Sequence, residues 1–428
     1  MNKFLFLILA SIFLSSCGKD PPETQAVIPT LTTTAISSIT SGSALSGGNI
    51  SADGGASVTA RGVCWSSTAN PTISGSHTTD GSGTGSFTSN ISGLTTSTTY
   101  YVRSYATNSA GTAYGNEVSF TTSAPDVYLA GSESNGITTV AKIWKNGTPT
   151  PLTNGSFYAF AYSVFVSGTD VYAAGAESNS TSSSGALPKM WKNGTPSTLS
   201  NITSSNAYSV FVSGSDVYVA GEENLPSALV ARLWKNSTSV PLATAGFGGF
   251  TTSVSVSGTD VYAGGVDNTS AFVPNAVTWK NGVKTTLTTV YGVVYGIFTS
   301  GNDLYAVGVE KPGANTIAKV WKNGTATSLT DGTNPAGALS VFVSGNDVYV
   351  AGYERSGTKL VAKVWKNGTP TSLTNGTNTA EAVSVFVSGN DVYVGGHDNN
   401  VAKLWKNGIA VPITLNGNGS RINCVFVK

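Results

Sequence analysis

The feature that most constrains the fold is a repeat in the C-terminal part of the chain. The tripeptide Asp-Val-Tyr, with Leu in place of Val once, recurs seven times at intervals of 43 to 46 residues. Each copy is followed by a tryptophan that is nearly always continued as Lys-Asn-Gly. The copies begin at Asp126, Asp170, Asp216, Asp260, Asp303, Asp347 and Asp391. Seven units of this length predict a closed or stacked array of supersecondary units.

Each repeat has the pattern of four short antiparallel strands. In the last copy we predict strands over residues 382–387, 391–396, 401–405 and 409–414. The turns Ser388-Gly389-Asn390 and Asn407-Gly408 contain residues that tolerate the positive φ of tight hairpins. No segment carries an apolar period of 3.6 residues, which excludes helical solenoids. The repeat therefore predicts a β-propeller with one four-stranded blade per copy.

The first strand of each predicted blade is apolar or small on both faces, as a sheet between two neighbouring sheets requires. Its first position is always small, which suits the crowded strand nearest the axis. The residues there are Ser163, Ser209, Ser253, Gly296, Ser340, Ser384 and Cys424. We therefore expect Cys424 to replace a serine in the core and not to act as a nucleophile.

The ends of the array predict how the ring closes. The array begins with the Asp126 strand and ends with residues 424–427, a strand of the type that precedes it. We expect this C-terminal strand to complete the first blade, which removes exposed sheet edges. The layout, with tryptophan near the end of the third strand, resembles WD-repeat propellers, although this chain has Trp-Lys where that family has Trp-Asp. The prediction is a seven-bladed propeller over residues 126–428.

Residues 28–122 show short alternating runs separated by Gly, Ser and Asn, as in a sandwich of antiparallel strands. The predicted strands cover residues 44–51, 59–66, 85–91, 100–107 and 117–121. The segments Gly93-Leu94, 98–103 and 106–111 resemble the end of a fibronectin type III domain, and residues 60–65 fit variants in Bacteroidetes surface proteins. The fold class is thus all-β, with a sandwich followed by a propeller.

The fibronectin resemblance implies roles for three residues and for the domain. Tyr100 would be the tyrosine corner, with its hydroxyl bonded to the chain near Leu94. Trp65 would be core packing, and Cys64 beside it a small buried hydrophobe. The resemblance implies a spacer or adhesive module without catalysis.

The N-terminus has a short positive region at Asn2 and Lys3, then an apolar run over residues 4–14 that ends at Leu14-Ser15-Ser16-Cys17. The run is too short to span a bilayer and has the pattern of a removable signal. It resembles a bacterial lipoprotein signal with its lipobox, which implies that Cys17 carries the lipid. We expect a signal over 1–17, a tether over 18–27 and a linker over 123–125.

The residues after Cys17 bear on location. Gly18-Lys19-Asp20 resembles the surface-export signals of Bacteroidetes lipoproteins, and no aspartate follows the cysteine directly. We expect a protein held at the outer membrane by its lipid anchor, with display on the cell surface left open. Charged residues make up 11% of the chain and the net charge is +1, so we expect no nucleic-acid partner. Of the three cysteines, Cys17 is expected to carry the lipid, and the two that remain exclude a disulfide framework.

Motifs for chemistry are scarce. His77 and His397 stand in different domains and outside any ligand-spaced cluster, so we expect no metal site and no cofactor. No Gly-x-Ser-x-Gly elbow or phosphate-binding loop occurs.

One acidic residue recurs after each second strand, and six copies carry a basic residue before the tryptophan. The acidic residues are Glu133, Glu177, Glu223, Asp267, Glu310, Glu354 and Asp398, and the basic ones are Lys142, Lys189, Arg232, Lys319, Lys363 and Lys403. We expect cross-strand ion pairs, with Asp398 and Lys403 nearly opposite each other. Val277 replaces the base in the fourth copy, which predicts that Asp267 has no partner.

Strand direction places two kinds of loop on one face of the propeller, namely the second-to-third hairpins and the inter-blade loops. These vary between copies, whereas the turns of the opposite face are nearly invariant, and recognition usually resides in variable loops. Aromatic residues gather in them at Phe157, Tyr158, Phe160, Phe247, Phe250, Phe272 and Tyr291. They are candidate ligand contacts, and the alternative is that several only plug the channel mouth.

The sequence thus predicts a non-enzymatic binding or adhesion module at the cell envelope, with a glycan or a protein as ligand. The alternative is a hydrolase or lyase that acts on polysaccharide. Such an enzyme needs paired carboxylates with shifted proton affinities in the propeller pocket, and Asp267 would be the first candidate.

Overall fold

The computed structural model describes residues 25–180, 185–240, 242, 244, 246–268, 273–415 and 419–428. Cys17, most of the predicted tether and Phe272 lie outside these residues. The chain divides into two compact units between Ala124 and Pro125. Every regular element in the described residues is a β-strand, and no helix there is long and apolar enough to cross a membrane.

The N-terminal unit is a sandwich of two antiparallel sheets. One sheet has the order β1 (Thr30–Thr33), β2 (Ser43–Ala52) and β5 (Gly85–Ser92). The other has the order β4 (Ser76–His77), β3 (Ala60–Ser66), β6 (Thr99–Asn108) and β7 (Gly111–Tyr114), and β8 (Val118–Thr121) also pairs with β6. Ile50, Val63 and Val102 are fully buried between the sheets, so the predicted sandwich is confirmed.

Three expectations for this unit are also confirmed. The backbone nitrogen of Thr95, next to Leu94, donates a hydrogen bond to the Tyr100 hydroxyl at 3.1 Å. Trp65 packs against the buried core, and Cys64 is fully buried. Burial raises the pKa of the Cys64 thiol to about 11, which keeps it protonated and unreactive.

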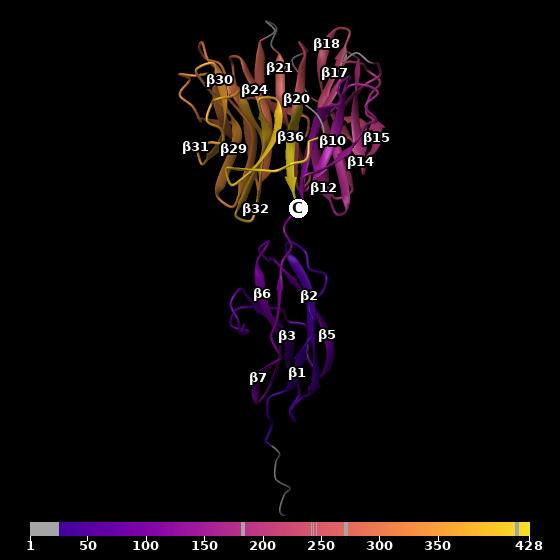
Figure 1. The fold of residues 1–428 in the computed structure, drawn as a ribbon, viewed down its shortest axis with the longest axis vertical. Coiled ribbons are helices and arrows are strands. Elements are labelled where there is room, and N and C mark those ends of the chain that lie inside the picture. The colour runs from indigo at the N-terminus through magenta and orange to yellow at the C-terminus, as the bar shows by residue number, and fades with distance from the viewer. Residues whose placement is uncertain are drawn as a thin grey trace, which may run out of the picture. The chain divides into compact units, whose positions relative to one another are not determined.

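The C-terminal unit consists of seven antiparallel sheets of four strands each, and it is a seven-bladed β-propeller (Figure 1). In blades two to seven the strands follow one another in chain order from the axis outwards. Blade two consists of β12 (Ala159–Ser167), β13 (Asp170–Ser178), β14 (Ala186–Lys192) and β15 (Thr195–Thr198). Blade three consists of β16 (Asn206–Ser213), β17 (Asp216–Leu225), β18 (Ala228–Lys235) and β19 (Thr238–Val240). Blade four consists of β20 (Gly249–Ser257), β21 (Asp260–Asn268), β22 (Pro274–Lys280) and β23 (Val283–Thr286). Blade five consists of β24 (Gly292–Ser300), β25 (Asp303–Glu310), β26 (Ile317–Lys322) and β27 (Thr325–Ser328). Blade six consists of β28 (Ala336–Ser344), β29 (Asp347–Ser356), β30 (Lys359–Lys366) and β31 (Thr369–Ser372). Blade seven consists of β32 (Ala380–Ser388), β33 (Asp391–Asp398), β34 (Val401–Lys406) and β35 (Ile409–Val411).

The first blade joins the two ends of this unit. It has the order β11 (Thr148–Pro151), β10 (Thr139–Lys145), β9 (Val127–Ser134) and β36 (Ser420–Val427). In Figure 1 the yellow C-terminal strand β36 lies beside β12, a strand from the start of the propeller. The backbone groups of Asp126 and Lys428 exchange hydrogen bonds of 2.8 and 2.9 Å. The predicted closure by the C-terminal strand is confirmed.

Hydrogen bonds and an ion pair explain why aspartate, lysine and asparagine recur at fixed positions in the repeat. In blade one, Asn146 adopts a φ of 50° in the hairpin turn, and its side chain accepts from the Val127 nitrogen and donates to Asp126. Lys145 lies 2.7 Å from the Asp126 carboxylate and above the Tyr128 ring. All seven blades repeat the Asp–Lys pair. Lysine after the tryptophan is therefore the partner of the aspartate that opens the repeat.

The tryptophans fill the spaces between blades. Trp191 is 1% exposed and packs with Ala130 and Ala141 of blade one and with Ala161 and Val164 of its own blade. The small side chains leave room for the indole ring, whose burial stabilises each blade interface by roughly 2–3 kcal/mol relative to exposure. Six of the seven repeat tryptophans are less than 2% exposed.

Candidate functional site

A cavity lies on the propeller axis because all seven inner strands contain a β-bulge. In blade two, Ala161 pairs with Gly175 and Ser163 pairs with Ala174, so Tyr162 has no partner on the second strand. The extra residue of a bulge leaves the ladder and changes direction. The seven bulge residues, together with Phe250, line a cavity of about 390 Å³. They are Tyr162, Tyr208, Thr252, Tyr295, Leu339, Val383 and Asn423.

Blades two and three give the cavity an aromatic wall. The rings of Phe160 and Tyr162 are nearly parallel, with centroids 6.1 Å apart, and Tyr162 contacts Tyr208 at 5.3 Å. The Tyr208 hydroxyl donates to buried Glu222 at 2.7 Å. Burial raises the pKa of Tyr162 to about 12, and burial followed by the Glu222 charge raises the pKa of Tyr208. Both hydroxyls therefore stay protonated at neutral pH.

Blade seven and the C-terminal strand bring charged groups close to the cavity. Glu381 stands two residues before the bulge, the position of Phe250 in blade four, and its carboxylate is 3.8 Å from Nε2 of His397. Burial raises the pKa of Glu381, although Arg421 opposes the shift. Burial lowers the pKa of His397, and Arg421 acts in the same direction. His397 is therefore neutral at pH 7, so this contact is not a full ion pair.

A ring of phenylalanines narrows the channel on the side of the invariant turns. Three residues beyond the bulge, Phe165 contacts Phe211 and Phe426, and Phe342 contacts Phe298 and Phe386, with centroids 4.5 to 4.9 Å apart. The ring centroids of Phe386 and Phe426 are 5.1 Å apart, and this contact joins the two groups of three rings. Each inner strand runs from the variable loops to the invariant turns, so the cavity lies on the loop side of this ring.

Blade four interrupts the phenylalanine ring. Ser255 occupies the equivalent position, and its hydroxyl lies 2.7 Å from that of Thr299 in blade five. Ser255 is buried, at 4% exposed.

The structure places two of the predicted ligand contacts at the cavity. Phe250 lines it, and Phe160 stacks on the lining residue Tyr162. Both lie in the inner strands β20 and β12, so their assignment to inter-blade loops was wrong. These strands begin two to four residues earlier than predicted, because residues before the bulge still pair with the second strand.

The other predicted aromatics lie in the inter-blade segments. Phe247 and Tyr291 are 42% and 39% exposed, and Phe157 is partly buried. The Tyr158 hydroxyl donates to the carbonyl oxygen of Ile137 at 3.1 Å, so Tyr158 contacts the hairpin between β9 and β10 of blade one. Phe272 lies outside the described residues.

Asp267 has a partner, contrary to the prediction. It is 3% exposed and forms an ion pair with Lys284 of the fourth strand β23. Lys284 is opposite Trp279 in the register, so it reaches Asp267 from the outer side of the blade. The prediction was wrong because it considered only the third strand as a source of the cation.

Five of the six predicted ion pairs are confirmed, and one is wrong. The pairs are Glu133–Lys142, Glu177–Lys189, Glu223–Arg232, Glu310–Lys319 and Glu354–Lys363. Their partners lie diagonally in the ladder, since Glu354 is opposite Val361 and Lys363 opposite Gly352. Asp398 and Lys403 have the same diagonal register but form no ion pair in the described structure.

Sequence reasoning missed the bulge residues as cavity lining. The signal was present: the residue before the recurrent small position varies from tyrosine to leucine and asparagine, whereas the two residues that follow it hardly change. A variable position within a near-invariant strand indicates a side chain that does not pack in the core. Among the described residues, no three His, Cys, Asp or Glu side chains gather closely enough to hold a metal ion.

The architecture defines the class of the protein, an all-β protein with a seven-bladed propeller of four-stranded blades. No protein-family model and no curated protein matches the chain. A puromycin-hydrolyzing peptidase from Mycobacterium tuberculosis is similar in structure, with 11% identity and a TM-score of 0.46 over 68% of this chain and 53% of that chain. This chain thus spans about half the length of that protein.

Two further solved structures are similar. TolB from Acinetobacter baumannii has 10% identity and a TM-score of 0.42, over 76% of this chain and 79% of its own. The β-propeller domain of the Trilobed protease from Pyrococcus furiosus has 8% identity and a TM-score of 0.40, over 74% of this chain and 94% of its own. Likeness at this level carries no argument about activity.

Proposed function

We propose that the chain is a non-enzymatic binding module whose axial cavity takes one or two sugar units of a glycan. The observation that supports this is the composition of the cavity, in which Tyr162, Tyr208 and Phe250 stand on one side and Thr252 and Asn423 add polar groups. A sugar ring has apolar faces that stack on aromatic rings and hydroxyls that both donate and accept. A volume of about 390 Å³ lies within the usual range for small-molecule sites.

The concave shape favours a glycan over a protein partner. A broad, flat surface suits a folded protein, whereas a cavity on the propeller axis encloses a small group. The protonated hydroxyl of Tyr162 can donate to a sugar oxygen, and the Tyr208 hydroxyl, whose proton goes to Glu222, can accept from a sugar hydroxyl. Tyr208 already donates to Glu222, which orients its ring before a ligand arrives.

A hydrolase or lyase acting on polysaccharide is the second candidate, and Glu381 is the observation that favours it. The raised pKa of Glu381 is a property of general acids. A glycosidase also needs a second carboxylate across the scissile bond. Glu222 accepts hydrogen bonds from Tyr208 and Asn206, and Asp267 is paired with Lys284, so neither is set up as the nucleophile or base.

The test uses the full-length protein in detergent on a glycan array, followed by calorimetric titration of the best glycan. Tyr162→Ala should weaken binding up to about tenfold, because stacking of this kind contributes about 0.5–1.5 kcal/mol. Lys322→Ala on the invariant-turn face is the matched control and should leave affinity unchanged. Affinity that survives Tyr162→Ala contradicts the proposal, and polysaccharide turnover that Glu381→Gln abolishes supports the enzyme.

We further propose that Cys17 anchors the protein to the outer membrane, and that the N-terminal sandwich spaces the propeller from the lipid. The lipobox-like run before Cys17 supports this.

A further inference from the structure

Blade seven departs from the ion-pair pattern of the other blades. In five blades a glutamate at the end of the second strand pairs with a lysine or arginine on the third strand. Asp398 and Lys403 occupy these positions in the same diagonal register as Glu354 and Lys363. Aspartate is one methylene shorter than glutamate, so the Asp398 carboxylate does not reach Lys403. One oxygen of Asp398, Oδ1, is shielded from solvent and accepts no hydrogen bond from the described residues.

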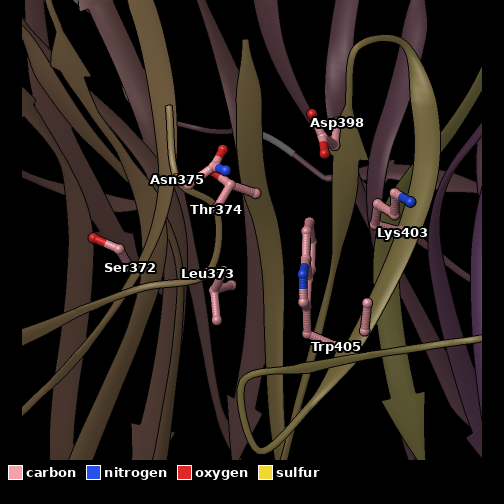
Figure 2. A pocket seen from close by; sticks show the side chains of 8 residues that line it. Ser372, Leu373, Thr374, Asn375, Asp398, Lys403 and Trp405 are labelled. Carbon is pink, nitrogen blue, oxygen red and sulfur yellow. The ribbon is translucent and has the colours of Figure 1, made fainter. Parts of the chain in front are cut away.

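The unpaired groups face a cleft between blades six and seven. The cleft has a volume of about 530 Å³. Figure 2 shows Thr374 and Asn375 on one wall and Asp398, Lys403 and Trp405 on the other. The hairpin of blade seven is the two-residue turn Asn399-Asn400, whose φ values are 51° and 61°. Such a short hairpin projects little beyond the last ladder pair, Asp398 and Val401.

The chemistry of the cleft indicates what it would bind. A shielded carboxylate oxygen without a donor costs free energy, so Asp398 favours a ligand that supplies an N–H or O–H group. Lys403 has only donors and favours a ligand oxygen. The amide of Asn375 can both donate and accept. A ligand that places a donor and an acceptor on neighbouring atoms meets these requirements, and the vicinal hydroxyls of a sugar do so.

We propose that this cleft is a second saccharide site, in which Asp398 accepts from one sugar hydroxyl and Lys403 donates to the oxygen of its neighbour. The site stands apart from the axial cavity, since the two share no lining residue. Two sites on one propeller would bind a long glycan chain more tightly than either site alone.

The test measures saturation-transfer NMR between the full-length protein in detergent and the methyl glycosides of glucose, galactose and mannose. All variants carry Tyr162→Ala, which removes one ring of the aromatic wall of the axial cavity and so weakens sugar binding there. The informative variant is Asp398→Glu, because the added methylene lets the carboxylate pair with Lys403 as in blade six. We expect saturation transfer to at least one glycoside in the Tyr162→Ala protein, its loss in Asp398→Glu, and a melting temperature that is unchanged or higher.

The matched control is Glu354→Gln, which breaks the equivalent pair in blade six. It should lower the melting temperature slightly and leave saturation transfer intact. Absence of transfer to all three glycosides in the Tyr162→Ala protein would overturn the second site, as would transfer that is undiminished in Asp398→Glu. The axial cavity is judged separately, by the effect of Tyr162→Ala on glycan affinity, so the two proposals fail independently.

Discussion

The backbone nitrogen of Val425 donates a hydrogen bond of 3.0 Å to the hydroxyl of Ser384. Val425 belongs to the C-terminal strand of blade one and Ser384 to the inner strand of blade seven, so the bond crosses the closing interface. Four other blade interfaces contain the same bond, with distances of 3.2 to 3.3 Å. The serine that follows five of the seven bulges therefore has a second role, because its hydroxyl accepts a hydrogen bond from a backbone nitrogen of the next blade.

This bond predicts that Ser384→Ala lowers the free energy of unfolding by about 1 kcal/mol, with a fall of a few degrees in melting temperature. The nitrogen of Val425 would lose its acceptor without gaining another. Differential scanning calorimetry checks the shift. Ser340→Ala removes the same bond to Val385 between blades six and seven and should have an effect of similar size. No change in either variant would contradict the role assigned to the serines.

The Asp–Lys pairs of the invariant-turn face predict how stability depends on pH. Hydrogen bonds from Lys280 and then Asn281 hold the pKa of Asp260 below its ordinary value of 3.8, and the bond to Asp260 raises the pKa of Lys280 above 10.5. The depressed aspartate stabilises the fold above about pH 4 and ceases to do so as the pH falls through its folded pKa. The raised lysine stabilises below about pH 10.5, and this is lost above its folded pKa.

The melting temperature should therefore be flat at intermediate pH and fall at both ends. The pairs are exposed, so added salt should shrink both falls. Asp260→Asn removes one of the seven Asp–Lys pairs, so it should reduce the fall in melting temperature at acid pH by about one seventh. An acid limb as steep in the variant carrying all seven Asp→Asn changes as in the native protein would contradict this explanation.

The gap in the phenylalanine ring at Ser255 predicts a stabilising change. The double substitution Ser255→Phe and Thr299→Val replaces the partly buried hydroxyl pair by the Phe and Val that the other blades contain. Completing the ring buries one more aromatic side chain, and we expect a gain of about 1–2 kcal/mol in the free energy of unfolding. Thermal denaturation measures it. Since Ser255→Phe alone leaves Thr299 without its partner, it should gain less, and a loss in the double variant would show that the gap has no room for a ring.

The lipobox-like run predicts that Cys17→Ser abolishes lipid attachment. Cells grown with labelled palmitate should label the native protein and not the variant, and fractionation should move the variant out of the membrane pellet. Cys424→Ser is the matched control and should leave labelling unchanged, because Cys424 lies in the inner strand of blade one. Equal labelling of the Cys17→Ser variant would contradict the anchor.

The local pattern of the repeat was sufficient to predict the fold. Few folds are compatible with period-two apolar runs, asparagine-glycine turns and seven copies of the repeat. A last strand without a partner in its own repeat, such as Cys424 to Val427, can complete the first blade, which lacks its inner strand. Tyr100, Trp65 and Cys64 were also predictable, because a tyrosine corner and core positions depend on neighbours within the same small sandwich. Five ion pairs followed from the sequence because each lies within a single hairpin.

Only the tertiary structure decided where the candidate sites lie. Tyr162, Tyr208, Tyr295 and Asn423 are far apart in the sequence, and they meet because a bulge in each blade turns one side chain towards a common axis. Lys284 reached Asp267 from a strand that the repeat pattern did not connect with it. The difference between Asp398 and the five paired glutamates is one methylene, and its effect depends on a diagonal distance that only the assembled ladder sets. Periodicity therefore specified the sheets, whereas closure of the ring determined which side chains share a cavity.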